Sequence, residues 1–303
     1  MFDPAPLVVQ PPGDSALLRA AADAAAVHWD LAPPELIRLG ANGLFGSGDV
    51  MLRVSRPTAS LQAALNLAEL LVGEGIRVAM PARPDVVEFD NGLAATAWQR
   101  IRHDPTLPVD WECVGAMVAR VHAVDPTRVG HEGIGHPLPF CGTFPWWDFD
   151  TMMSEANELD AVTVAALKAA RDRHSWWSAA ALERPLVLCH GDVHPGNVLV
   201  DQLGPILIDW DLLCLGPAAW DHAPLMTWTR RWGGEPGMYE AFSGGYGPRV
   251  DDDLAGALAE MRLLAATLMR LQRARIDPAH HAEALLRLAY WRGDSDAPMW
   301  HAH

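Results

Sequence analysis

Three polar residues at a fixed spacing follow two apolar segments in the second half of the chain. Asp192 lies in the run His-Gly-Asp-Val-His-Pro-Gly-Asn, Asn197 ends this run, and a second apolar segment leads to Asp209. Phosphoryl transfer needs a group that accepts the proton of the attacking hydroxyl, and oxygen ligands that hold Mg²⁺ on the phosphates. These residue types therefore predict Asp192 as the catalytic residue and Asn197 and Asp209 as the metal ligands.

Two histidines flank the predicted catalytic carboxylate. We expect His190 to orient the loop through hydrogen bonds to the backbone and His194 to support it. The alternation of His190, Asp192 and His194 is also compatible with a transition-metal site. A metallohydrolase of that kind needs further histidines at strand ends, and the other histidines stand in loops or at helix starts. This alternative predicts tightly bound zinc or iron.

The elements that must position these residues follow from periodicity and turn signals. Helices are predicted at 14–28, 60–73, 111–124, 147–159, 161–182, 218–231, 254–275 and 278–292. Strands are predicted at 35–39, 49–55, 86–89 and 93–98, a glycine-rich turn at 40–48, a loop at 244–248 and a frayed end at 300–303. The expected fold class is therefore α+β with two lobes: a small antiparallel β lobe at 1–101 and a larger, mainly helical lobe at 102–303. Ligands favour the cleft between such lobes.

The bulk composition excludes several classes of protein. The chain has 303 residues and a net charge of −15, which argues against a nucleic-acid partner and is compatible with a cationic small molecule. No apolar run is long enough to span a membrane, and the first residues lack the features of a signal peptide. The four cysteines have no C-x-x-C spacing, so we expect free thiols in a reducing, cytoplasmic setting.

The loop motif, together with the segment Ile-Asp-Trp-Asp at 208–211, resembles the aminoglycoside phosphotransferase and choline kinase family, distant relatives of protein kinases. The resemblance covers nearly the whole chain. The segment 118–122 resembles the helix beneath the catalytic loop of this family, and the segment 216–221 resembles the part after the metal loop, whose Asp221 is expected to anchor the loop. The resemblance implies a protein-kinase-like fold, Mg²⁺, and ATP or GTP as the phosphoryl donor.

The resemblance also exposes a departure on the nucleotide side. The family places a lysine on its third strand to hold the phosphates, whereas this chain has Arg53 there, and its one lysine is Lys168. Arginine can hold phosphate oxygens in a bidentate manner, but its geometry differs. The glutamate partner of that lysine is also displaced, because the aligned position is close to Ala64. Whether Glu69 or Glu74 pairs with Arg53 is left open.

Two further segments are expected to bind the nucleotide. Asn42 and Gly43 would cover the phosphates with backbone N–H groups. The segment of Trp98, Gln99 and Arg100 would form the hinge whose backbone contacts the purine edge.

The acceptor is expected over the C-terminal helices, near Asp211 and either Trp146 or Trp147. The resemblance and the acidity favour an aminoglycoside or another sugar-bearing antibiotic or natural product. A metabolic kinase acting on choline, an amino alcohol, homoserine or a sugar is the alternative. A nucleotide-binding pseudokinase is a third reading, which the intact Asp192 opposes. The acceptor, the choice between ATP and GTP, the oligomeric state and a role in antibiotic resistance or biosynthesis remain open.

Overall fold

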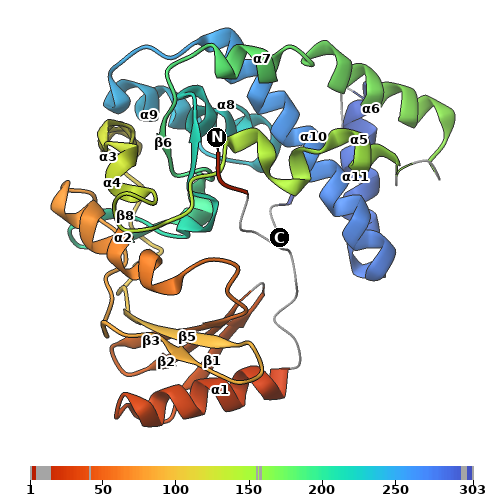
Figure 1. Cartoon of the computed structure of the whole chain (residues 1–303). Coiled ribbons are helices and arrows are strands. Elements are labelled where there is room, and N and C mark those ends of the chain that lie inside the picture. Colours follow the sequence, from red (N-terminus) through yellow and green to blue (C-terminus); the bar gives the residue numbers. More distant parts are fainter. Residues whose placement is uncertain are drawn as a thin grey trace.

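The chain has two unequal parts with a sheet in one and most of the helices in the other (Figure 1). The computed structural model describes residues 2–4, 15–40, 42–154, 156, 159–294 and 299–301. A five-stranded antiparallel sheet precedes a mainly helical part. The predicted α+β class with a two-lobed, kinase-like arrangement is therefore confirmed.

The N-terminal sheet holds its strands in the order β1-β2-β3-β5-β4. The strands are β1 (Glu35–Leu39), β2 (Gly43–Ser47), β3 (Val50–Ser55), β4 (Val87–Glu88) and β5 (Ala94–Gln99). Helix α1 (Ser15–His28) lies beside this sheet and buries an alanine-rich side against Phe45 and Leu52. Residue 14, at which the predicted helix 14–28 begins, lies outside the described residues. Arg53 stands in β3 between Leu44 of β2 and Thr96 of β5.

Helix α2 (Leu61–Gly73) connects the two parts through its apolar side. Leu67 and Leu71 are buried in the same cluster as Val118 of helix α3 (Trp111–Ala123). Burial of two leucines removes enough apolar surface from water to stabilise this contact by several kcal/mol, at ~1.5–3 kcal/mol for each side chain. The helix therefore belongs by sequence to the first lobe and by packing also to the second.

Residues 2–4, which the sequence assigns to the first lobe, pack on the second. A carboxylate oxygen of Asp3 accepts a hydrogen bond of 2.9 Å from the N–H of Leu138, and the ring of Phe2 lies 5.3 Å from that of Phe140. The chain therefore contacts the helical part before it enters the sheet.

The second part consists of helices around two short two-stranded sheets. After α3, its helices are α4 (Pro126–Val129), α5 (Phe149–Ser154), α6 (Ala161–Arg173), α7 (Trp177–Leu182), α8 (Ala219–Trp232), α9 (Met238–Tyr246), α10 (Asp252–Ile276) and α11 (His281–Trp291). One sheet pairs β6 (Val187–Cys189) with β9 (Cys214–Gly216), and the other is the hairpin of β7 (Val198–Asp201) and β8 (Gly204–Leu207). The loop of Asp192 connects β6 to β7 and the loop of Asp209 connects β8 to β9, so both loops start from hydrogen-bonded backbone.

Three predicted boundaries are wrong for physical reasons. The glycine-rich stretch 40–48 is mostly strand, because β2 runs through it and a tight turn at Gly48, with φ +57°, follows. The predicted helix 161–182 breaks between α6 and α7, which allows Trp177 to enter the core. The predicted helix 147–159 is shorter: α5 covers 149–154, and residues 155, 157 and 158 lie outside the described residues.

The predicted loop 244–248 is the end of helix α9. A Cβ on Gly245 would lie 1.9 Å from the carbonyl oxygen of Glu112, and one on Gly115 would lie 2.0 Å from that of Phe242. These glycines therefore allow α3 and α9 to approach with their backbones in contact. Glycine here serves helix packing rather than a turn.

The C-terminal segment is anchored, contrary to the prediction of a frayed end. Trp300 is 2% exposed, and its N–H donates to the carbonyl oxygen of Arg231 over 2.7 Å. The N–H of His301 donates to Glu283 over 2.9 Å. Residues 302 and 303 lie outside the described residues. No helix in the described part of the chain has both the length and the apolarity needed to cross a membrane.

Candidate active site

The loop after β6 carries Asp192 into a ring of polar groups. One carboxylate oxygen lies 3.3 Å from Nε2 of His194, and the other lies 3.5 Å from a guanidinium nitrogen of Arg262 in α10. Burial opposes ionisation, but attraction to His194 and Arg262 outweighs it and holds the pKa of Asp192 well below its ordinary value. Asp192 is therefore an anion that can accept a hydrogen bond from a hydroxyl.

The backbone of this loop is held by Asp221, at the start of α8. Its two carboxylate oxygens each accept a hydrogen bond of 2.8 Å, one from the N–H of His190 and one from the N–H of Gly191. Nε2 of His122 lies 3.1 Å from Asp221, and Nδ1 of His122 lies 2.9 Å from the hydroxyl of Tyr246. Burial opposes the charge of Asp221, but the hydrogen bond from His122 outweighs it and lowers the pKa. The predicted anchor thus has a second layer of support.

His190 connects the two loops of the site. Its Nε2 donates to the carbonyl oxygen of Ile208 over 3.1 Å, while its Nδ1 accepts from the N–H of Asp192 over 3.3 Å. These contacts need a neutral ring with its proton on Nε2, and burial lowers the pKa of His190 accordingly. Gly191 has φ +90°, and a Cβ there would lie 2.0 Å from the carbonyl oxygen of Leu212. The turn therefore requires glycine.

The two predicted metal ligands offer hard oxygen atoms. The amide nitrogen of Asn197 donates a hydrogen bond to the carbonyl oxygen of Asp192 over 2.9 Å. The amide oxygen is the atom of this side chain that could bind a cation. Asp209 adopts a left-handed conformation, with φ 66°. Removal of its carboxylate from water and repulsion from Asp211 raise its pKa. A cation at this position would relieve that repulsion, and the amide and carboxylate oxygens match the preferences of Mg²⁺.

Arg53 forms its ion pair with Asp211, which follows the metal loop. Burial opposes the positive charge, but Asp211 and Asp209 outweigh it and raise the pKa of Arg53. Neither helix glutamate occupies this position: Glu69 is exposed, and Glu74 lies 2.5 Å from Arg128. In the part of the chain that the structure describes, Arg53 therefore pairs with Asp211 rather than with either glutamate, a choice that the sequence had left open.

The other predicted nucleotide contacts are partly engaged in the sheet. Gly43 begins β2, and the carbonyl oxygen of Asn42 accepts a hydrogen bond from Gly40 over 3.1 Å. The N–H groups of Gln99 and Arg100 donate to Met80 and Asp49 over 2.7 and 2.8 Å. These two N–H groups cannot serve a purine.

The three tryptophans predicted at the site, Trp98, Trp146 and Trp147, differ in their surroundings. The indole of Trp98 donates to the hydroxyl of Thr96 over 2.8 Å. Trp146 is half-buried and stacks on Phe144 at 4.9 Å. Trp147 is 5% exposed and lies in the core, so a ligand at the surface cannot reach it.

Sequence reasoning missed two contributors to the site. Arg262 donates to the carbonyl oxygen of Gly191 and lies beside Asp192, yet it belongs to a helix without any motif. Trp228 stacks on the ring of His194 at 4.9 Å. The richness in tryptophan was a signal for the second contact, but it does not single out one ring.

The structure does not support the transition-metal alternative. In the part of the chain that the structure describes, the histidine, cysteine and carboxylate groups close enough for a metal are His122, Cys189 and Asp221. His190 and His194 are not among them. His122 and Asp221 are hydrogen-bonded to each other, and Asp221 also holds the loop backbone. These hydrogen bonds give His122 and Asp221 a structural role in holding the loop.

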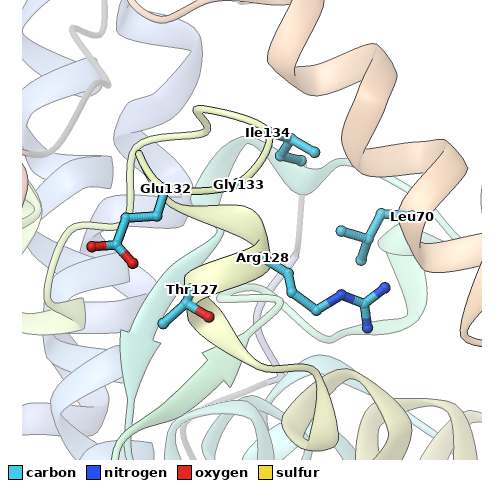
Figure 2. Close-up of a pocket in the computed structure, with 6 residues that line it drawn as sticks. All are labelled: Leu70, Thr127, Arg128, Glu132, Gly133 and Ile134. Atoms are coloured by element: carbon cyan, nitrogen blue, oxygen red, sulfur yellow. The ribbon is translucent and has the colours of Figure 1, made fainter.

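A hollow of about 420 Å³ lies elsewhere, between α2 and the region of α4 (Figure 2). Its lining residues are Leu70, Thr127, Arg128, Glu132, Gly133 and Ile134. None of the predicted site residues is among them. The site around Asp192 is therefore distinct from this surface depression.

Comparisons with known proteins agree with this geometry. The sequence profile described as "Phosphotransferase enzyme family" matches residues 42–264, which is more than half of the chain. No curated protein matches the chain. Among solved structures, the fold resembles that of spectinomycin phosphotransferase in complex with ADP and spectinomycin, at 19% identity and a TM-score of 0.66, with 95% of this chain and 96% of the other covered.

Two further structures share the fold. An amicoumacin kinase is 13% identical with a TM-score of 0.68 and coverage of 93% of this chain and 97% of the other. A choline/ethanolamine kinase family protein from Mesorhizobium loti is 20% identical with a TM-score of 0.63 and coverage of 94% and 95%. The loop geometry and the family match together lead to one conclusion: this chain belongs to the phosphotransferase enzyme family and is a small-molecule kinase.

Proposed function

We propose that this kinase transfers the γ-phosphoryl group of ATP or GTP to a hydroxyl of a small molecule, and that the acceptor is an aminoglycoside or another sugar-bearing antibiotic or natural product. The observation that carries the proposal is the loop in which Asn197 hydrogen-bonds to the backbone of Asp192 over 2.9 Å. This bond sets a metal-binding amide against a catalytic carboxylate. The relatives with solved structures bind ADP, GDP or AMP-PNP, which supports a nucleotide as the donor.

In the proposed reaction, Asp192 accepts a hydrogen bond from the acceptor hydroxyl and orients its oxygen toward the γ-phosphorus. A bond forms between these two atoms while the bond from the γ-phosphorus to the bridging oxygen breaks, and the nucleoside diphosphate leaves. The hydroxyl proton passes to Asp192 and then to solvent. Because Asp192 is a weak base, it acts by orientation before it accepts the proton late in the step.

The other residues neutralise charge on the phosphates. Arg53 would contact the phosphate oxygens from β3. Asn197 and Asp209 would hold Mg²⁺, which supplies neutralisation of the phosphate charge when bound. Arg262 and His194 keep Asp192 anionic and in place. The net charge of −15 supports a cationic acceptor, to which the half-buried Trp146 would offer the ring face that is not stacked on Phe144.

Release of ADP and of GDP with Mg²⁺ tests the proposal across aminoglycosides, other sugar-bearing antibiotics, choline, amino alcohols, homoserine and simple sugars. We expect release with one antibiotic class and a loss of at least ~100-fold in Asp192→Asn. Release with choline or homoserine alone would instead support the metabolic alternative. Nucleotide binding without release, unchanged in Asp192→Asn, would support the pseudokinase and contradict the proposal.

A further inference from the structure

The guanidinium of Arg53 and the carboxylate of Asp211 form an ion pair that links strand β3 of the N-terminal sheet to the loop after Asp209. Both side chains are partly enclosed, with exposed fractions of 22% and 34%. Asp211 lies in the 3-10 turn Trp210–Leu212, directly after the left-handed residue Asp209. The position of the guanidinium is therefore coupled to the conformation of the metal loop.

Helix α2 offers no carboxylate that could pair with Arg53 in place of Asp211. By the family resemblance, the glutamate that would pair with the strand cation aligns close to Ala64, which has no carboxylate. Glu69 is exposed, and Glu74, at the end of the helix, is engaged with Arg128 at 2.5 Å. The buried side of α2 is filled by apolar residues that pack toward α3, so a rotation that brought Glu69 inward would expose that side to water.

We propose that Asp211 is the positioning residue for Arg53 and takes the role that a helix glutamate would otherwise have. This inference rests on the proposed function. This one ion pair would fix two positions: that of the Arg53 guanidinium, which would hold the phosphates, and that of the loop of Asp209, which would hold the metal. Opening of the metal loop would withdraw Asp211 and release Arg53 from its place over the phosphates.

The choice of arginine fits this arrangement. A guanidinium has five N–H donors in a rigid fork, so it can keep Asp211 on one nitrogen while other N–H groups contact phosphate oxygens. A lysine ammonium is a single point charge on a flexible stem, and the carboxylate and the phosphates would compete for it more directly. The arginine on β3 and the carboxylate on the metal loop therefore belong together.

Binding of the non-hydrolysable ATP analogue AMP-PNP with Mg²⁺, measured by titration calorimetry, tests this inference without knowledge of the acceptor. We expect Asp211→Asn to weaken binding about tenfold, as for loss of a charge-assisted contact. Asp211→Glu should stay within about threefold of the wild type because the charge is retained. Glu69→Gln, the matched control on α2, should bind as the wild type does.

A double-mutant cycle separates positioning from a general structural effect. In the Arg53→Gln background, Asp211→Asn should cause no further loss, because the partner whose position it controls is gone. Melting temperatures without nucleotide should agree among the variants, since a partly exposed ion pair contributes little to stability. Equal affinity of Asp211→Asn and the wild type would overturn the inference, as would losses that add in the double variant.

Two other outcomes are also decisive. Tighter binding by Asp211→Asn would mean that Asp211 competes with the phosphates for Arg53, which contradicts a positioning role. If the wild type bound neither AMP-PNP nor the corresponding GTP analogue GMP-PNP, the proposed function and this inference would be overturned together. A wild type that binds and an Asp211→Asn variant that binds equally would overturn this inference alone.

Discussion

The imidazole of His194 lies flat on the indole of Trp228, with ring centroids 4.9 Å apart and ring planes inclined by 8°. In this orientation Nδ1 of His194 accepts a hydrogen bond from Gly196 over 3.0 Å, and Nε2 faces Asp192 at 3.3 Å. Stacking on the indole thus holds the ring plane of His194 in the orientation that brings Nε2 to Asp192.

Replacement of Trp228 by alanine should lower turnover about tenfold, because the imidazole loses the surface that fixes its rotation. Trp228→Phe keeps a ring and should retain most of the activity. The affinity for AMP-PNP should be unchanged in both variants, since Trp228 contacts His194 in the loop of Asp192 and the predicted phosphate contact is Arg53. Steady-state kinetics with the identified acceptor check this, with the exposed Trp176→Ala as control. Equal turnover in Trp228→Ala and wild type would show that the stacking has no role in catalysis.

Replacement of Trp300 by alanine should reduce the free energy of unfolding by about 3 kcal/mol. The ring is 2% exposed, it lies 5.3 Å from Trp232 and 5.5 Å from Tyr290, and the guanidinium of Arg287 is 5.3 Å from its centroid. Urea unfolding measures the change. The neighbouring Met299, which is 56% exposed, provides the control, and Met299→Ala should change stability by less than about 0.5 kcal/mol. A frayed terminus would instead leave both variants at the stability of the wild type.

Two adjacent glycines in α9 should respond to alanine in opposite ways. A Cβ on Gly245 would meet the backbone of Glu112 at 1.9 Å, so Gly245→Ala should destabilise the protein by about 3 kcal/mol or more, through separation of α3 and α9. A Cβ on Gly244 has no atom within 4 Å, so Gly244→Ala should stabilise it by ~0.5–1 kcal/mol through helix propensity. Chemical denaturation of the two variants tests the pair. Equal changes would disprove the close approach of the two helices.

His222 should make the protein less stable in acid. Burial and the nearby charge of His122 lower its pKa from 6.5 to about 4, and its ring contacts Tyr246 at 4.5 Å. The unfolded chain therefore binds the proton more tightly than the folded one. The stability contributed by the neutral ring is complete above pH 6.5, the ordinary pKa of a histidine, and is lost as the pH falls toward the folded pKa, by on the order of 3 kcal/mol.

His222→Phe removes the titrating group and keeps an aromatic ring. Between about pH 7.5 and about pH 4.5, this variant should lose less stability than the wild type, by roughly 2–3 kcal/mol. Urea unfolding at the two pH values gives the difference, and the exposed His28→Asn should behave as the wild type does. The same loss in His222→Phe and wild type would assign the acid sensitivity to other groups.

Much of the site could be predicted because its groups are close in sequence. Asp192, Asn197 and the two histidines share one short loop, and a turn of that length restricts where each side chain points. The bounds of α2, α3 and α10 followed from apolar periodicity. In α2 the structure also has Ser60 as the capping residue, whose side chain accepts a hydrogen bond from the N–H of Ala63. The glycines of α9 misled the same reasoning, because their role is set by α3 and not by their neighbours in the chain.

The sequence by itself determined the family, the fold class and which polar residues the two loops carry, since residue types and local spacing hold that information. Only the tertiary structure decided the partner of Arg53, the support of Asp221 by His122, the place of Arg262 beside Asp192 and the burial of Trp300. Arg53 and Asp211 are 158 positions apart, His122 and Asp221 are 99 apart, and Arg262 is 71 positions from Gly191, the neighbour of Asp192 to which it donates. Local propensity does not constrain such distances. The packing of helices and sheet brings these groups together, and burial then makes each unpaired charge or exposed ring too unfavourable to persist.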